Sequence, residues 1–95
     1  MIYCVDIDNT ICRTVGSDYA SSKPIKQRIN IINHLYHNGN KIIIFTGRGS
    51  KSGKDWLDFT VKQLREWGVL YHELQMGKPS CDVIFDDKAK NIDDY

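Results

Sequence analysis

The sequence lacks any apolar run that approaches the roughly 20 residues needed to span a bilayer, and its formal net charge is only +1. Its three cysteines are an odd number without CxxC spacing, which favours reduced, buried thiols over a disulfide framework or a common zinc site. The opening residues, MIYCVDIDNT, place acids where a signal peptide has its apolar segment. We therefore expect a cytoplasmic protein that contacts no membrane and offers nucleic acid no broad basic surface, although a local basic patch is compatible with this charge.

The chain is short, with 95 residues of which 41% are hydrophobic. A chain of this length buries only roughly 60–65% of the surface that its unfolded form exposes, which supports one modest core. We expect one domain over residues 1–95, because no repeat, linker or low-complexity segment interrupts the sequence.

Short apolar runs alternate with segments of helical period. The runs at residues 2–7, 41–45, 69–74 and 82–85 predict strands. Apolar residues recur every three or four positions from Pro24 to Gly39 and from Trp56 to Gly68, which predicts two helices, whereas the aperiodic stretch 12–23 predicts a loop. Strands that alternate with helices pair in parallel through crossovers, so we expect an α/β fold with an open parallel sheet of about four strands and flanking helices.

Carboxylates stand at two of these predicted strand ends. Asp6 and Asp8 close the first strand two residues apart, and Asp86 and Asp87 close the fourth. The carboxyl ends of parallel strands meet at one edge of a sheet, where ligands bind. Four carboxylates at one edge repel one another unless a cation lies among them. Since oxygen ligands suit a hard ion, the sequence predicts a Mg²⁺ site.

Groups that suit an oxyanion follow the other strands. Thr46, Gly47 and Arg48 follow the second strand and offer a hydroxyl, an unhindered backbone N–H and a guanidinium. Lys78 follows the third strand and supplies a point charge that balances carboxylates and holds a phosphoryl oxygen. These residues predict a site for the phosphate group of a substrate.

Taken together, these residues resemble the four motifs of the haloacid dehalogenase superfamily of Mg²⁺-dependent phosphohydrolases. Residues 6–10 resemble its first motif, Thr46-Gly47 its second, Lys78 its third, and Asp86-Asp87 with Asn91 its fourth. The resemblance covers nearly the whole chain and is greatest to small capless members described as capsule or polysaccharide biosynthesis phosphatases. It implies a minimal Rossmann-like sheet.

The resemblance also implies a role for each site residue. Asp6 is the nucleophile that forms an aspartyl-phosphate, and Asp8 is the general acid and base. The Asp6 carboxylate, the Asp8 carbonyl and Asp87 hold Mg²⁺, with Asp86 close behind. The residues that bind the phosphoryl group are Thr46, Gly47 and Lys78.

The sequence departs from the superfamily pattern at two motif positions. Asn9 stands where members usually have glycine, and we expect the turn to survive because asparagine tolerates a left-handed backbone. Asn91 replaces a further acid, which lowers the negative charge around the metal. Members of the superfamily usually close the site with a cap inserted after the first motif or before the third. The stretch from Thr10 to Pro24 leaves room for a short flap only and that from Leu74 to Lys78 for nothing, so we expect no cap domain and an open site. A four-stranded sheet with one uncovered side also favours homo-oligomers.

We therefore expect a Mg²⁺-dependent phosphomonoesterase that acts on a phosphorylated sugar, a nucleotide or a larger phosphorylated substrate. Two alternatives stay open: a nucleic-acid end phosphatase, and a non-catalytic subunit that binds a phosphorylated ligand. Lys51 and Lys54 fit substrate contacts and a solvated loop equally well. Trp56 and Trp67 are eleven residues apart, or three helical turns, which favours a core position for both over a sugar-stacking surface.

Overall fold

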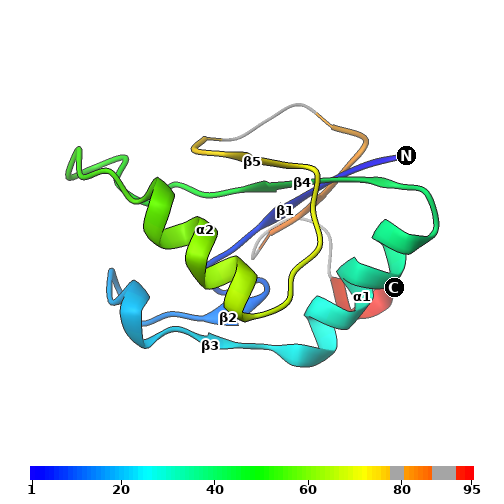
Figure 1. The fold of residues 1–95 in the computed structure, drawn as a ribbon, viewed down its shortest axis with the longest axis horizontal. Helices are drawn as coiled ribbons and strands as arrows, with labels where there is room; N and C mark the ends of the chain where they lie inside the picture. The colour runs from blue at the N-terminus through cyan, green and yellow to red at the C-terminus, as the bar shows by residue number, and fades with distance from the viewer. Residues whose placement is uncertain (78–80, 87–91) are drawn as a thin grey trace.

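The computed structural model describes residues 1–77, 81–86 and 92–95. Its main sheet has four parallel strands in the order β5-β4-β1-β6, with bounds β1 Ile2–Asp6, β4 Lys41–Phe45, β5 Glu73–Gln75 and β6 Val83–Phe85 (Figure 1). The other elements are β2 Cys12–Arg13, β3 Lys23–Pro24, the 3₁₀ turns η1 Tyr19–Ser21 and η2 Ile92–Asp94, and the helices α1 Lys26–His37 and α2 Leu57–Glu66. The predicted α/β class and the four-stranded parallel sheet are confirmed.

The two helices lie on the same side of the sheet (Figure 1). They bury Ile29 and Ile32 of α1 and Leu64 of α2 against alternate residues of the strands. The strand residues of this main core are Tyr3, Val5, Ile42, Ile44 and Phe85. Burial of this apolar face fixes the strands in place, and with them the residues that follow each strand.

The apolar cluster on the opposite face of the sheet is smaller, and the residues at its centre are buried. Cys4, Ile43 and Phe45 are at most 7% exposed, so the uncovered side expected from the sequence is wrong for these residues. β5 and β6 lie at opposite edges of the sheet. Cys81, which precedes β6, packs against the small cluster on this face.

The expectation of three reduced thiols is wrong for two of the cysteines. Cys4 in β1 is bonded to Cys81, which precedes β6, and only Cys12 is a free and buried thiol. Spacing gave no sign of the bond because the two residues are 77 positions apart. The parallel pairing of β1 with β6, with Cys4 opposite Ile84, brings them together.

Replacing both Cys4 and Cys81 by serine is expected to lower the free energy of unfolding by about 2–4 kcal/mol, because the bond restricts the unfolded chain. Urea unfolding of the wild type with and without reductant, beside the double variant, measures this difference. Cys12→Ser keeps the disulfide and serves as the matched control, with its reductant sensitivity intact. Equal stability of the oxidised and reduced wild type contradicts the prediction.

The predicted ends of helices and strands differ from the observed ones where tertiary contacts override the local sequence pattern. α1 begins at Lys26 instead of Pro24, because Pro24 pairs with Cys12 in a two-stranded antiparallel sheet. The predicted strand 69–74 is wrong over most of its length, since β5 begins only at Glu73. Asn33 of α1 holds the preceding segment, accepting from Leu70 N–H at 2.9 Å and donating to the Gly68 carbonyl at 2.9 Å.

The stretch 12–23, predicted as a loop, forms a short flap together with Pro24; we call residues 12–24 the ribbon. It pairs β2 with β3 antiparallel and carries η1 between them. It is anchored to the main fold where Ile25 N–H donates to the Ile11 carbonyl at 2.9 Å. None of the helices in the described part of the chain is long or apolar enough to cross a membrane.

Candidate functional site

The turn after β1 carries the two acids of the first predicted motif. Asp6 ends the strand, and Asp8 lies in a turn where the N–H groups of Thr10 and Ile11 both donate to the Ile7 carbonyl. Asn9 has a φ of 63°, so the left-handed backbone predicted for this position is confirmed. Its side-chain oxygen accepts from Thr14 N–H at 3.1 Å, which ties the turn to the ribbon.

Strand register brings a third acid to Asp6. β1 and β6 are adjacent and parallel, with Val5 opposite Phe85, so Asp6 and Asp86 follow as the next residues at the same edge. The chain runs from β1 to β4 and β5 on one side and returns to β6 on the other, so the strand order reverses between β1 and β6. A reversal of this kind is where open α/β sheets bind ligands. Asp6 Oδ1 also accepts from Ile7 N–H at 2.8 Å.

Asp8 is held by Arg48, a contact that the sequence did not predict. Arg48 Nε donates to Asp8 Oδ2 at 3.0 Å and its Nη2 donates to Oδ1 at 2.9 Å, which is a bidentate ion pair. Arg48 Nη1 donates to Gln63 Oε1 at 2.8 Å and to Thr60 Oγ1 at 3.3 Å, both on α2. The guanidinium carbon lies 4.5 Å from the centre of the Tyr19 ring.

This arrangement corrects the role expected for Arg48. Its side chain has no exposed surface, and the donors named above face protein groups. The guanidinium thus contacts Asp8 and α2, whereas the sequence led us to expect a contact with substrate. Asp8 itself remains 22% exposed at its side chain and accessible from the site.

The ribbon supplies further partners for Asp8. Thr14 Oγ1 donates to Asp8 Oδ1 at 2.7 Å, and the Cys12 thiol lies 3.8 Å from the same oxygen. Burial raises the pKa of Cys12 above its usual value, the hydrogen bond with Thr14 opposes this, and the Asp8 charge adds to it. Neither Thr14 nor Cys12 was a predicted site residue, because a residue in an aperiodic loop gives no signal of its contacts.

The second predicted motif follows β4 directly. Thr46 is buried, with 1% exposure, and its N–H donates to the Gln75 carbonyl at 3.1 Å. Its hydroxyl oxygen accepts from Arg48 N–H at 3.1 Å, which leaves the hydroxyl proton available to a ligand. β4 is the neighbour of β1, with Phe45 opposite Asp6, so Thr46 and Gly47 follow at the same edge of the sheet as Asp6.

Lys78 and Asp87, and with them Asn91, lie outside the described residues. Within residues 1–77, 81–86 and 92–95, no cluster of three or more histidine, cysteine or acidic side chains is placed to hold a metal. Among the described residues, the carboxylates that could ligate a metal ion are those of Asp6 and Asp86, which strand register brings to one edge of the sheet. Both carboxylate oxygens of Asp8 pair with Arg48. Mg²⁺ takes oxygen ligands and is usually held by one or two protein carboxylates with water and substrate, so this donor set fits it.

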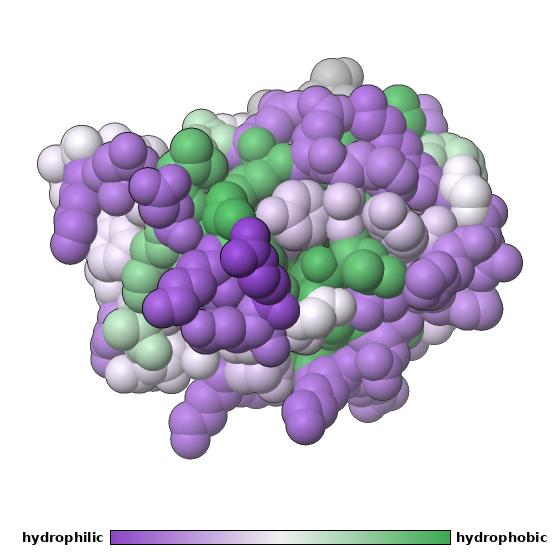
Figure 2. Space-filling view, in the orientation of Figure 1, coloured by the Kyte–Doolittle hydropathy of each residue, from purple (hydrophilic) through white to green (hydrophobic). Residues whose placement is uncertain are grey.

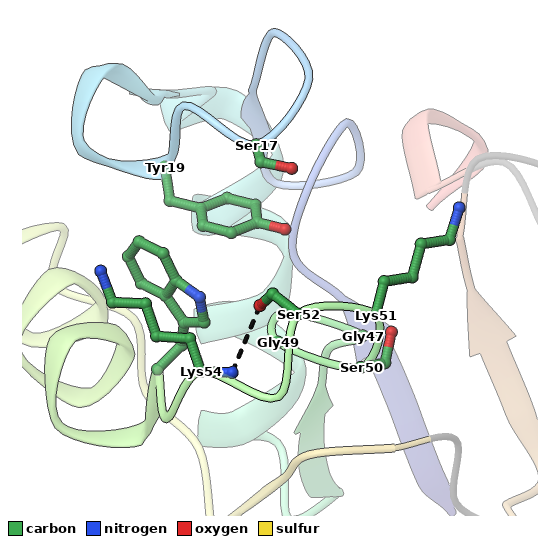
Figure 3. A pocket seen from close by; sticks show the side chains of 9 residues that line it. Ser17, Tyr19, Gly47, Gly49, Ser50, Lys51, Ser52 and Lys54 are labelled. Atoms are coloured by element: carbon green, nitrogen blue, oxygen red, sulfur yellow. Dashed lines mark hydrogen bonds between the residues drawn. The ribbon is translucent and has the colours of Figure 1, made fainter.

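A pocket of about 450 Å³ opens beside this edge, between the ribbon and the segment that follows Gly47 (Figure 3). It is lined by Ser17, Tyr19, Gly47, Gly49, Ser50, Lys51, Ser52, Lys54 and Trp56. Trp56 lies in the pocket wall and in neither apolar cluster, so its predicted core position is wrong, whereas Trp67 packs against the main core as expected.

The fold is shared with a solved structure. A crystal structure of a structural-genomics target from Vibrio cholerae is similar with a TM-score of 0.76 and 26% sequence identity, covering 99% of this chain and 86% of that one. No protein-family model matches the chain, and no curated protein matches it. The fold and site together define a small α/β domain with acids at the carboxyl edge of a four-stranded parallel sheet.

Proposed function

We propose that this chain is a Mg²⁺-dependent phosphomonoesterase with a haloacid dehalogenase-type Rossmann fold, in which Asp6 is the nucleophile. The observation that carries the proposal is the register of three adjacent strands. This register brings Asp6, Asp86 and the Thr46-Gly47 pair to one edge beside the reversal in strand order. Acids for a cation and neutral donors for an oxyanion at a single edge are the requirements of phosphoryl transfer.

In the proposed reaction, an oxygen of Asp6 attacks the phosphorus of the substrate. A new oxygen–phosphorus bond forms while the bond to the leaving alcohol breaks, and Asp8 donates a proton to that alcohol. Water then attacks the aspartyl-phosphate and gives a proton back to Asp8, which releases inorganic phosphate and restores Asp6. Mg²⁺, when bound, offsets the negative charge of the phosphoryl group.

The contacts of Asp8 favour one of its two oxygens as the carrier of this proton. Oδ1 accepts from both Arg48 and Thr14, whereas Oδ2 accepts one hydrogen bond, from Arg48 Nε, among the described residues. The remaining lone pair of Oδ2 can take a proton without loss of the other contacts. Arg48 and Thr14 thus fix the carboxyl group while Oδ2 serves as acid and base.

The groups that would bind phosphate lie on the next strand. The Thr46 hydroxyl proton and the Gly47 N–H are proposed to donate to phosphoryl oxygens, with Lys78 as the cation. Asp6 and Asp86 would hold the metal, together with the Asp8 carbonyl and Asp87. The ribbon has only two residues in each of its strands, and we propose that the site also admits substrates larger than a simple sugar phosphate.

The proposal is tested by phosphate release from p-nitrophenyl phosphate, sugar phosphates, nucleotides and 5′-phosphorylated oligonucleotides, with Mg²⁺ and with EDTA. Turnover is expected with Mg²⁺, to be lost with EDTA and to return when Mg²⁺ is added in excess. Turnover unchanged by EDTA contradicts the metal requirement. Folded protein that binds phosphorylated compounds and turns over no member of the panel replaces the enzyme with a non-catalytic binding subunit.

A further inference from the structure

We propose that the 450 Å³ pocket beside Gly47 binds the part of the substrate beyond the transferred phosphoryl group. The pocket fits a non-planar, hydroxylated group that carries a second anion, a carboxylate or a phosphate, and Lys51 contacts that anion. This inference rests on the proposed phosphatase function, since Gly47 belongs both to the proposed phosphoryl site and to the pocket wall. We call this the serine–lysine pocket.

The chemistry of the lining favours an anionic and hydroxylated ligand. The pocket has three serine hydroxyls, two lysines and two aromatic side chains, and its lining contains no carboxylate. In Figure 3 Ser17 and Tyr19 lie across the open space from the segment that carries Ser50 and Ser52. The volume is within the range of about 300–1,000 Å³ that is usual for small-molecule sites.

The segment that forms one wall has its own hydrogen bonds. Ser50 N–H donates to the Gly47 carbonyl at 3.0 Å, Gly53 N–H to the Gly49 carbonyl at 2.8 Å, and Lys54 N–H to Ser52 Oγ at 3.2 Å. Gly49 has a φ of +83°, and a Cβ there would overlap with the Lys54 carbonyl oxygen. The wall is therefore a hydrogen-bonded turn in which Gly49 packs directly against the Lys54 carbonyl.

The aromatic side chains disfavour a flat base as the ligand. Tyr19 and Trp56 meet edge to face, with ring centres 4.8 Å apart and planes at 84°. Each ring has a cation over one face, Arg48 over Tyr19 and Lys54 over Trp56, both at 4.5 Å. A planar base binds by stacking on an open ring face, whereas the hydroxyl groups of a sugar can bond to the serine hydroxyls of the lining.

The two lysines of the pocket are not equivalent. The Lys54 ammonium is held over the Trp56 ring, whereas Lys51 is exposed and forms no ion pair with the described residues. In Figure 3 their side chains extend on opposite sides of the open space. Lys51 is thus the cation that is available to a second anion of a ligand.

Paired substrates that differ by one anion test the inference. We expect kcat/KM to be at least about tenfold higher for fructose 1,6-bisphosphate than for fructose 6-phosphate, and for 6-phosphogluconate than for glucose 6-phosphate, in line with one charge-assisted contact. Lys51→Met is expected to reduce both ratios to near one. Lys62→Met, which removes the same charge from the exposed side of α2, is the matched control and is expected to keep them.

Wild-type ratios near one, or a Lys51→Met variant that keeps the preference, would overturn the inference. A higher kcat/KM for nucleoside monophosphates than for all the sugar phosphates also overturns it. Binding is measured independently by the fluorescence of Trp56 in a Trp67→Phe variant titrated with fructose 1,6-bisphosphate. A saturable change in fluorescence, with an affinity that Lys51→Met weakens about tenfold, supports the pocket even if no phosphate is released. The pocket and the phosphatase proposal can therefore be contradicted separately.

A pair of glycines tests the wall itself. Gly49 and Gly53 both have positive φ, +83° and +74°, so alanine carries a similar backbone cost at either position, but only at Gly49 does a Cβ meet protein atoms. Gly49→Ala is expected to raise KM for fructose 1,6-bisphosphate at least about fivefold over Gly53→Ala, since a displaced wall loses contacts worth about 1 kcal/mol. Equal KM values for the two variants contradict the proposed wall.

Discussion

Asp6→Asn is expected to lower kcat for phosphate release roughly 10⁴-fold or more, the size of effect seen when a covalent nucleophile is removed from other enzymes. The amide keeps the shape of the side chain and its place at the end of β1, beside Asp86, but it is a poor nucleophile and has lost its charge. The measurement is the initial rate with p-nitrophenyl phosphate at saturating Mg²⁺.

The control for this variant has to separate chemistry from folding. Asp58→Asn makes the same change at an exposed position in the first turn of α2 and is expected to retain wild-type activity. Thermal unfolding of both variants verifies that each is folded at the assay temperature. If folded Asp6→Asn retains more than a few per cent of the wild-type rate, Asp6 is not the nucleophile.

Arg48→Met is expected to lower the free energy of unfolding by about 3–5 kcal/mol, which is the usual cost of removing one partner from a buried ion pair. The guanidinium is fully buried, and its loss leaves Asp8, Gln63 and Thr60 without the donors that they now share. Activity is expected to fall as well, because Asp8 loses its bidentate support. Urea unfolding and phosphate release are both measured.

Two further variants identify the source of this effect. Arg48→Lys keeps the charge, but a lysine cannot form the bidentate pair, so it is expected to restore only a minor part of the stability. If the cost comes from the unpaired carboxylate, Asp8→Asn combined with Arg48→Met is more stable than the sum of the two single changes predicts. A change of less than about 1 kcal/mol in Arg48→Met would contradict a structural role for the pair.

Much of the fold could be predicted because the strongest signals are local. The isoleucine run of β4 fills both faces of the sheet at three successive positions, a pattern that no surface strand shows. The periodic apolar residues of α1 and α2 likewise identify the one buried face of each helix. β5 could not be bounded in this way, because part of the segment before it bonds to the side chain of Asn33 in α1, through Gly68 and Leu70.

The candidate site was predicted only as a set of strand ends. That Asp6 lies beside Asp86 depends on a register between segments about 80 positions apart, and no local pattern encodes that register. The pairing of Asp8 with Arg48 spans 40 positions and gave Arg48 a role opposite to the one expected. The contact of the Tyr19 ring with Arg48 was also missed, because it forms only when the ribbon is folded.

The position of β6 also determines the order in which the sheet is completed. During synthesis β1, β4 and β5 are made before β6. One edge of β1 therefore lacks its partner strand during that interval. Two hydrogen bonds join residues 80 positions apart at this edge: Ile2 N–H donates to the Asp82 carboxylate at 2.8 Å, and Asp82 N–H donates to the Ile2 carbonyl at 3.1 Å. Until that contact forms, the central strand of the site can pair with a strand from another chain, so the assembly of Asp6 with Asp86 is also the step that most needs protection from aggregation during synthesis.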